Sequence, residues 1–281
     1  MKNEKLIYDI GVCFGEDTLH YLKEGHNVIG VEANVYLHKR NEKLFRKYIK
    51  NGSLILVNKG ITNGNEKKTF YYNKTMPAFS SFDKEQSVKH GHNQIIELEV
   101  ETTTINDLFN KYGVPYYLKS DIEGYDLIVI QSLKSNLKPT YISVEAKPEI
   151  FDEILSQLIK LGYSKFKIIN QYTHLALTNT FEYEHKNLSL VERFYQSVKY
   201  NSNIIFKVLR FLKAELILEH IFNIRKELTF KLGSSGTFAE ATDGVWSTAD
   251  EIRKIFTETY SHYIKNKKSE YQDYWADLHA K

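Results

Sequence analysis

Short apolar runs and longer segments with an apolar stripe alternate along the first 180 residues of the chain. The apolar runs predict buried strands at residues 7–10, 28–32, 53–58, 95–100, 116–120, 141–144 and 166–170. The segments between them predict helices at residues 17–24, 36–50, 105–111, 125–133 and 151–161. This alternation predicts the α/β class, with a doubly wound, mostly parallel sheet and helices on both faces.

Two segments are predicted to form antiparallel pairs instead. Asn63-Gly64 is a strong hairpin signal, so residues 67–72 are expected to return beside the strand before them. The runs at 166–170 and 175–178 are expected to form a final antiparallel pair.

A mainly helical pattern begins near Phe181, and Thr248 followed by Glu251 marks the start of a last helix. We therefore predict a first domain over residues 1–180 and a helical C-terminal extension over residues 181–281. Lys and Arg modestly outnumber Glu between residues 186 and 231. A solvated helical face is the simplest explanation, and the alternatives are a site for an anionic sugar nucleotide or a homodimer interface.

Composition changes this picture little. The net charge of +3 over 281 residues is too small to indicate a nucleic-acid partner. Cys13 is the only cysteine, which fits a reducing, cytoplasmic location. No apolar run approaches the ~20 residues of a membrane span, so none is expected.

The first candidate site follows the first predicted strand. Asp9, Gly11 and Gly15 stand where this strand turns into a helix. Glycine lets the backbone approach a ligand that a Cβ atom would block. The N–H groups of the loop and of the helix N-terminus favour a polar or anionic group there.

A second acidic residue, Glu32, ends the next predicted strand about twenty residues on. A carboxylate at this place accepts hydrogen bonds from both hydroxyls of a ribose. Together with the acid at Asp9, it suits a nucleoside with a cationic or zwitterionic end, such as S-adenosylmethionine (SAM), with S-adenosylhomocysteine (SAH) as the product. The alternatives are a buried acid that caps loop amides, for Asp9, and an exposed strand end, for Glu32.

Two further acids, Asp121 and Glu145, end the predicted strands at 116–120 and 141–144. Ligands bind outside the carboxyl ends of strands in open α/β sheets, so these side chains are expected on the same rim as Asp9 and Glu32. Asp121 is the first candidate for a general base or metal ligand, and Glu145 is the second. His174 is a third catalytic candidate. No zinc spacing is present, and a hard divalent ion, if required, would be held by Asp121 and Glu145.

The three motifs together carry a family resemblance. Ile-Tyr-Asp9-Ile-Gly11-Val-Cys-Phe-Gly15, Val-Glu32-Ala-Asn and Leu-Lys-Ser-Asp121-Ile-Glu-Gly resemble FkbM-type SAM-dependent methyltransferases over about residues 6–178. The resemblance implies a class I methyltransferase, Rossmann-like fold with a seven-stranded sheet, and SAM contacts at Asp9, Gly11, Gly15 and Glu32. It also implies methyl transfer to oxygen, often on sugars of surface glycans or natural products. The long region 181–281 departs from the usual pattern and leaves the acceptor open.

With what this resemblance implies, we expect a SAM-dependent O-methyltransferase for a sugar, in nucleotide-linked form, in bacterial surface polysaccharide (capsule or lipopolysaccharide) biosynthesis. One alternative is an NAD(P)-dependent oxidoreductase of a nucleotide sugar. The missing third glycine and the acid at Asp9 speak against it. The other alternative is a glycan-assembly subunit that keeps the fold without turnover.

Overall fold

The computed structural model describes residues 3–88, 94–178, 189–200, 204–222, 230, 234–265 and 275–281. The chain divides into two compact units, one of Met1–Phe166 with Asp277–Lys281 and one of Lys167–Ala276. The functional division at residue 180, with an extension for acceptor binding or dimerisation, stays a prediction.

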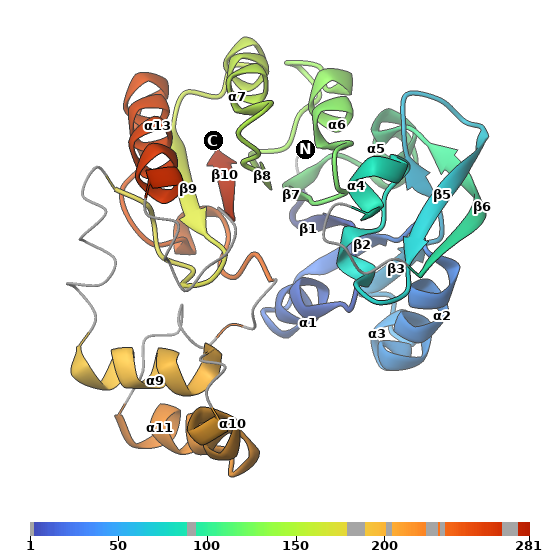
Figure 1. Ribbon diagram of the computed structural model, residues 1–281. Coiled ribbons are helices and arrows are strands. Elements are labelled where there is room, and N and C mark those ends of the chain that lie inside the picture. The colour runs from blue at the N-terminus through green and yellow to red at the C-terminus, as the bar shows by residue number, and fades with distance from the viewer. Residues whose placement is uncertain are drawn as a thin grey trace. The chain divides into compact units, whose positions relative to one another are not determined.

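Seven strands form one sheet in the order β3-β2-β1-β7-β8-β10-β9 (Figure 1). The pairs β1–β2, β1–β7, β2–β3 and β7–β8 are parallel, whereas β10 runs antiparallel to β8. This confirms the predicted doubly wound, mostly parallel, seven-stranded sheet. The strand bounds are β1 (Asn3–Ile10), β2 (Asn27–Val31), β3 (Leu54–Val57), β7 (Pro115–Ser120), β8 (Tyr141–Glu145), β9 (Phe166–Asn170) and β10 (Ala276–Ala280).

A second, smaller sheet has the order β4-β6-β5, with β4 (Gly60–Ile61), β5 (Lys67–Asn73) and β6 (Ile95–Thr103). The predicted hairpin at Asn63-Gly64 is wrong, because β4 and β5 do not pair with each other. Both pair with β6, β4 in parallel and β5 antiparallel. The turn signal predicts that β5 pairs with the strand just before it. Instead, β5 pairs with β6, which comes later in the chain.

Helices connect the parallel strands. The first unit contains α1 (Glu16–Lys23), α2 (Val35–Leu44), α3 (Arg46–Lys50), the 3-10 turn η1 (Pro77–Phe79), α4 (Lys84–Val88), α5 (Ile105–Tyr112), α6 (Asp126–Ser132) and α7 (Phe151–Lys160). Figure 1 shows α1–α3 below the strands β1–β3 and α5 and α6 above them. The second unit contains α9 (Leu190–Tyr200), α10 (Ile204–Phe211), α11 (Ala214–Phe222), η2 (Ala239–Ala241) and α13 (Ala249–Lys265).

Side-chain caps fix where several helices begin. Asn34 precedes α2 and accepts the backbone N–H groups of Tyr36 and Leu37. Thr248 and Glu251 form the predicted capping box of α13, with Thr248 N–H donating to the Glu251 carboxylate at 2.7 Å. Such caps satisfy amide donors that the first helical turn leaves without partners.

The end of the chain differs from the prediction. Residues 175–178 form only a single antiparallel bridge with β9, between Ile169 and Ala176. The last residues were expected to be helical, but they form β10, which is buried between β8 and β9. The short segment Ala-Asp-Leu-His-Ala gives a weak strand signal, and its place in the sheet depends on partners more than a hundred residues away.

Candidate functional site

Four acidic residues lie at the carboxyl ends of neighbouring parallel strands. Asp9 and Glu145 lie within the ends of β1 and β8, while Glu32 and Asp121 directly follow β2 and β7. Since these strands are adjacent in the order β2-β1-β7-β8, the four residues follow one edge of the sheet. This edge is where open α/β sheets bind their ligands.

The glycine loop after β1 is held against both neighbouring strands. Gly11 N–H donates to the Val31 carbonyl at 3.0 Å, and Asp121 N–H donates to the Ile10 carbonyl at 3.0 Å. Gly11 has φ +90°, and a Cβ atom there would lie 2.0 Å from the Asp121 carbonyl oxygen. Gly15 caps α1 with φ +83° and faces the ring of Phe45. Both positions therefore require glycine, and both keep the loop close to the strand ends.

Gly11→Ala is expected to lower the free energy of unfolding by about 3 kcal/mol or more, because it adds both backbone strain and a clash with the neighbouring strand end. Gly25→Ala is the matched control: Gly25 has φ +86°, but a Cβ atom added there would meet nothing within 4 Å. It should cost only about 1–2 kcal/mol, from strain alone. Urea unfolding of both variants measures the difference, and equal losses would contradict the close approach at Gly11.

Glu32 is almost fully buried, and each of its carboxylate oxygens accepts one backbone N–H. Oε2 accepts from Cys13 and Oε1 from Asn34, both at 2.8 Å. Burial raises the pKa of Glu32 to about 7, although these two hydrogen bonds act in the opposite direction. An ionised carboxylate has about four acceptor positions, so about two remain after the backbone bonds. Glu32 thus has the acceptors that the two hydroxyls of a ribose require.

Asp9 is fully buried beneath the loop rather than open to a ligand. Its Oδ2 accepts the Thr18 hydroxyl at 2.5 Å, and its Oδ1 lies 3.6 Å from the ammonium of Lys119. Burial raises the pKa of Asp9 to about 6, partly offset by Lys119. The side chain therefore links β1 to the start of α1, where Thr18 lies, and to β7.

Lys119 joins three of the acids of the site. Its Nζ lies 3.1 Å from Asp17, 3.6 Å from Asp9 and 3.5 Å from Asp121. Lys119 itself is 3% exposed, and these carboxylates raise its pKa well above the usual value despite the burial. Asp121 is the accessible member, with 31% of its side chain exposed. One buried cation thus holds the ends of β1 and β7 and the start of α1 together.

A second cation, Lys147, lies between the remaining acids. Its Nζ is 2.8 Å from Glu123 and 2.8 Å from Glu145. Carboxylate oxygens of Asp121, Glu123 and Glu145 lie within 4.8 Å of one another. Burial, followed by the charge of Glu123, raises the pKa of Glu145 well above its usual value. The structure thus brings Asp121 and Glu145 together and adds Glu123, but each of the three carboxylates already has an ammonium partner, Lys119 for Asp121 and Lys147 for the other two.

His174 lies in the other compact unit, Lys167–Ala276. It is buried, has φ +58°, and its Nε2 lies 2.8 Å from the Ser234 carbonyl oxygen. The ring also packs against Phe230 at a centroid distance of 5.4 Å. These contacts describe a side chain held within its own unit, and its predicted catalytic role stays a prediction.

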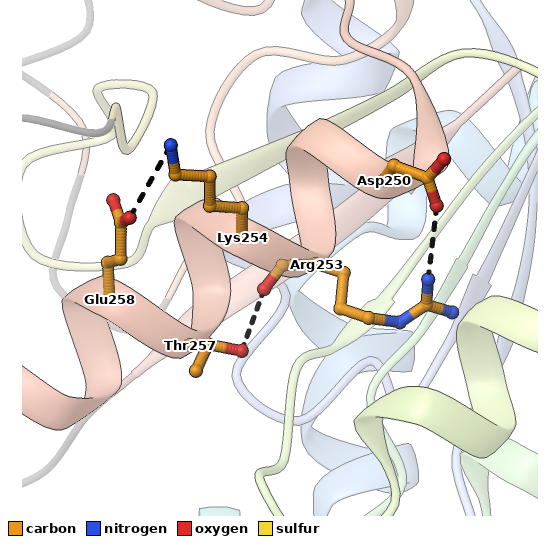
Figure 2. Close-up of a pocket in the computed structure, with 5 residues that line it drawn as sticks. All are labelled: Asp250, Arg253, Lys254, Thr257 and Glu258. Atoms are coloured by element: carbon orange, nitrogen blue, oxygen red, sulfur yellow. Dashed lines mark hydrogen bonds and ion pairs between the residues drawn. The ribbon is translucent and has the colours of Figure 1, made fainter.

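A pocket also lies along α13, lined by Asp250, Arg253, Lys254, Thr257 and Glu258 (Figure 2). All five residues come from this one helix. Arg253 lies 3.4 Å from Asp250 and Lys254 lies 3.8 Å from Glu258, so the charges pair along the helix surface. This arrangement is typical of a solvated helical face.

Sequence reasoning did not assign roles to Lys119, Lys147 and Asp17. For Lys119 a signal was present: a lysine inside an otherwise apolar central strand needs an acidic partner. The parallel register places it directly beside Asp9 on β1. Lys147 lies two residues beyond the end of β8, and its position between Glu123 and Glu145 depends on tertiary structure alone.

The sheet order and the acidic residues along its carboxyl edge define a class I, Rossmann-like methyltransferase fold. The family model described as the methyltransferase FkbM domain matches residues 9–165, more than half of the chain. The chain therefore belongs to the FkbM methyltransferase family. The matched range contains Asp9, Gly11, Gly15, Glu32, Asp121 and Glu145, and it ends before His174.

Two solved methyltransferase structures resemble the chain distantly. Precorrin-6y C5,15-methyltransferase from Geobacter metallireducens GS-15 has a TM-score of 0.37 at 9% identity, covering 60% of this chain and 69% of that chain. Coclaurine N-methyltransferase bound to N-methylheliamine and SAH has a TM-score of 0.34 at 10% identity, covering 100% of this chain and 67% of that chain. At this low similarity, the two structures give no information on the methyl acceptor of this protein. No curated protein matches the chain.

Proposed function

We propose that this protein is an O-methyltransferase that transfers the methyl group of SAM to a hydroxyl of a sugar, in nucleotide-linked form. The proposed setting is the cytoplasmic synthesis of a bacterial surface polysaccharide. The observation that carries the proposal is Asp121, a partly exposed carboxylate at the end of β7, beside the loop of Gly11 and Gly15. A hydroxyl acceptor needs such a group because its proton must leave as the new bond forms.

The proposed contacts of the cofactor lie at the carboxyl ends of β1 and β2. Glu32 would accept the ribose hydroxyls, and the turn from Gly11 to Gly15 would bring the backbone close to the ligand. The proposed role of Asp9 is to position the glycine loop, because its carboxylate is fully buried between Thr18 and Lys119. SAM supplies an electrophilic methyl group on a sulfonium centre.

Asp121 is the proposed general base. Its Oδ2 lies 3.5 Å from the Lys119 ammonium, and 31% of its side chain is exposed at the edge of the sheet. Holding the acceptor oxygen in line with the methyl group and the sulfur provides much of the reduction in the activation barrier. Glu145 is the second candidate, and its contact with Lys147 makes it less available than Asp121.

A role for a divalent ion is the alternative to a simple base. Asp121, Glu123 and Glu145 offer the oxygen ligands that Mg²⁺ or Ca²⁺ prefers. Such an ion would have to displace Lys147, whose ammonium lies 2.8 Å from two of these carboxylates. Turnover that survives EDTA would favour the base, whereas turnover that EDTA abolishes and Mg²⁺ restores would favour the ion.

Asp121→Asn is expected to lower kcat by about 100- to 10,000-fold, because the amide keeps the size of the side chain but accepts a proton poorly. SAH affinity, measured by calorimetry, should change little, since the proposed SAM contacts lie at β1 and β2. Asp152→Asn on α7 is the matched control and should keep normal turnover. Normal turnover in Asp121→Asn would reject the proposed base.

SAH release with a panel of acceptors tests the substrate class. Nucleotide-linked sugars, the matching free sugars, and amino sugars in which an amine replaces the hydroxyl are compared. The proposal expects turnover with a nucleotide-linked sugar and a methyl ether in the product by mass spectrometry. Turnover confined to amine acceptors would overturn the O-methyltransferase assignment. SAM binding without turnover on any panel member would favour a non-catalytic role.

A further inference from the structure

The helices α10 and α11 expose an unusual amount of apolar surface. Ile204 is 70% exposed, Phe211 is 86% exposed, and Ile221 is 63% exposed. We call this surface the α10–α11 face, and its main apolar members are Ile204, Val208, Phe211, Leu212, Ile217 and Ile221. Single exposed apolar side chains are normal, but six on two consecutive helices and the turn between them indicate an interaction site.

The opposite sides of the two helices already pack within their own unit. Phe206 of α10 meets Phe194 of α9 with ring centroids 6.3 Å apart, and Arg210 donates to the Val198 carbonyl. On α11, Leu218 packs against the core pair Leu175 and Tyr195. Figure 1 shows α9, α10 and α11 gathered in one group. The α10–α11 face is therefore a second apolar side that the core of this group does not use.

The exposed charges on this face are cationic. Lys207 and Lys213 are exposed beside the apolar residues. The acids of the described helices α10 and α11 are Glu215 and Glu219, and both are half-buried. The Tyr195 hydroxyl donates to Glu219, which turns this acid inward. An apolar surface flanked by lysines is complementary to a partner that offers an apolar interior with anionic groups next to it.

We propose that the α10–α11 face docks this protein onto the surface of an anionic lipid bilayer. Short amphipathic helices with lysine flanks lie in the headgroup region with the apolar side toward the acyl chains. The long lysine side chains reach the lipid phosphates while their stems cover apolar surface. The helices have 8 and 9 residues, roughly 12–14 Å in length, so they suit lying in the interface. Among the described residues, none of the helices has the length and apolarity that crossing a membrane requires.

A second copy of the chain is the competing occupant. A symmetric dimer through this face would bring equivalent lysines into one interface, and the described part of the face exposes no acid to pair with them. Lipid phosphates provide that missing negative charge. The charge pattern therefore favours the bilayer over a second copy.

Flotation of the full chain with vesicles tests the proposal. One vesicle set contains phosphatidylcholine with roughly 30% phosphatidylglycerol, and the other contains phosphatidylcholine alone. We expect flotation with the anionic vesicles, clearly weaker flotation with the neutral ones, and a decrease at high salt. Equal flotation with both sets, or none with either, would overturn the proposal.

Two variants separate the contributions of charge and apolar contact. Lys207→Gln with Lys213→Gln should weaken partitioning by about thirtyfold, from the loss of two lysines near the surface. Phe211→Ser with Ile217→Ser should weaken it by roughly tenfold or more. Leu44→Ser with Lys43→Gln, an exposed apolar and basic pair on α2, is the matched control and should float like the unmodified chain.

Light scattering of the same proteins tests the competing occupant. A stable dimer that Phe211→Ser with Ile217→Ser dissociates, without flotation of the unmodified chain, would assign the face to a second copy and overturn the proposal. If the serine variant folds poorly, the lysine variant and the comparison of the two vesicle sets still decide the question. These readouts do not depend on methyl transfer, so they stand apart from the proposed function.

Discussion

Lys119→Met is expected to lower the free energy of unfolding by about 3–5 kcal/mol. Methionine fills a similar volume but removes the Lys119 ammonium, which lies within 3.6 Å of Asp9, Asp17 and Asp121. Asp9 and Asp17 are buried, and both lose the ammonium that faces them in the folded protein. Urea unfolding at neutral pH measures the loss.

The loss should depend on pH in a defined direction. Burial already raises the pKa of Asp9 to about 6 with Lys119 in place, and the pKa must rise further without it. A folded carboxyl with a raised pKa stabilises the protein below its unfolded pKa, and this stability is lost as the pH rises through the folded pKa. Lys119→Met should therefore destabilise the protein less at about pH 5 than at about pH 8.

Two comparisons make this expectation specific. Lys254→Met removes a lysine whose Nζ lies 3.8 Å from Glu258 on the surface of α13 (Figure 2), and it should cost no more than about 0.5 kcal/mol. Adding Asp9→Asn to Lys119→Met should recover part of the stability, because one uncompensated charge is removed. Equal losses for Lys119→Met and Lys254→Met, or no recovery in the double variant, would show that Lys119 does not hold the three acids together.

The first part of the fold could be predicted because its signals are local. Apolar runs of four to six residues mark the central strands β1, β2, β7 and β8, and parallel pairing needs no information beyond the alternation with helices. β10 could not be predicted in this way. Its partner β8 is more than a hundred residues earlier in the chain, and its own five residues include Asp277 and His279, which read as a polar tail. The failed hairpin at Asn63-Gly64 has the same cause, because β6 outcompetes the local partner.

The site was predictable to the extent that strand ends determine it. Asp9, Glu32, Asp121 and Glu145 share one edge because of strand order alone. What the sequence could not reveal is which of these acids is accessible. Asp9, whose contact with SAM stays a prediction, has a fully buried carboxylate, while Asp121 is partly exposed. Burial at a strand end depends on the loops above it, and those loops are placed by Lys119 and by the glycines.

Glu32→Gln is expected to weaken SAH binding by about 10- to 100-fold. A hydrogen bond to a charged group contributes about 1.5–3 kcal/mol, and one acceptor oxygen of Glu32 becomes a donor in the variant. That donor would also face the N–H of Cys13 or Asn34, which the carboxylate now accepts at 2.8 Å. Calorimetric titration with SAH measures the affinity, and thermal unfolding of the same samples shows how much of the variant is folded.

The pH dependence of the affinity distinguishes a ligand contact from a purely structural role for Glu32. Its pKa is raised to about 7 by burial, so the carboxyl holds a proton in much of the protein at neutral pH. Ribose hydroxyls that donate to the carboxylate would favour its ionised form, so binding should release protons. The affinity of the unmodified protein should rise with pH up to about 7, by at most about tenfold per pH unit, and level off above it. Titrations in two buffers of different ionisation enthalpy measure the protons released.

In Glu32→Gln this rise should disappear, because the group that titrates has been removed. Glu42→Gln, at an exposed position of α2, is the matched control and should keep both the affinity and its pH dependence. If Glu32→Gln loses affinity but keeps the rise with pH, another group titrates, and Asp9, with a pKa of about 6, is the first to examine. If it keeps both, Glu32 serves only to hold the backbone of Cys13 and Asn34, and the assignment of the ribose contact to the end of β2 is wrong.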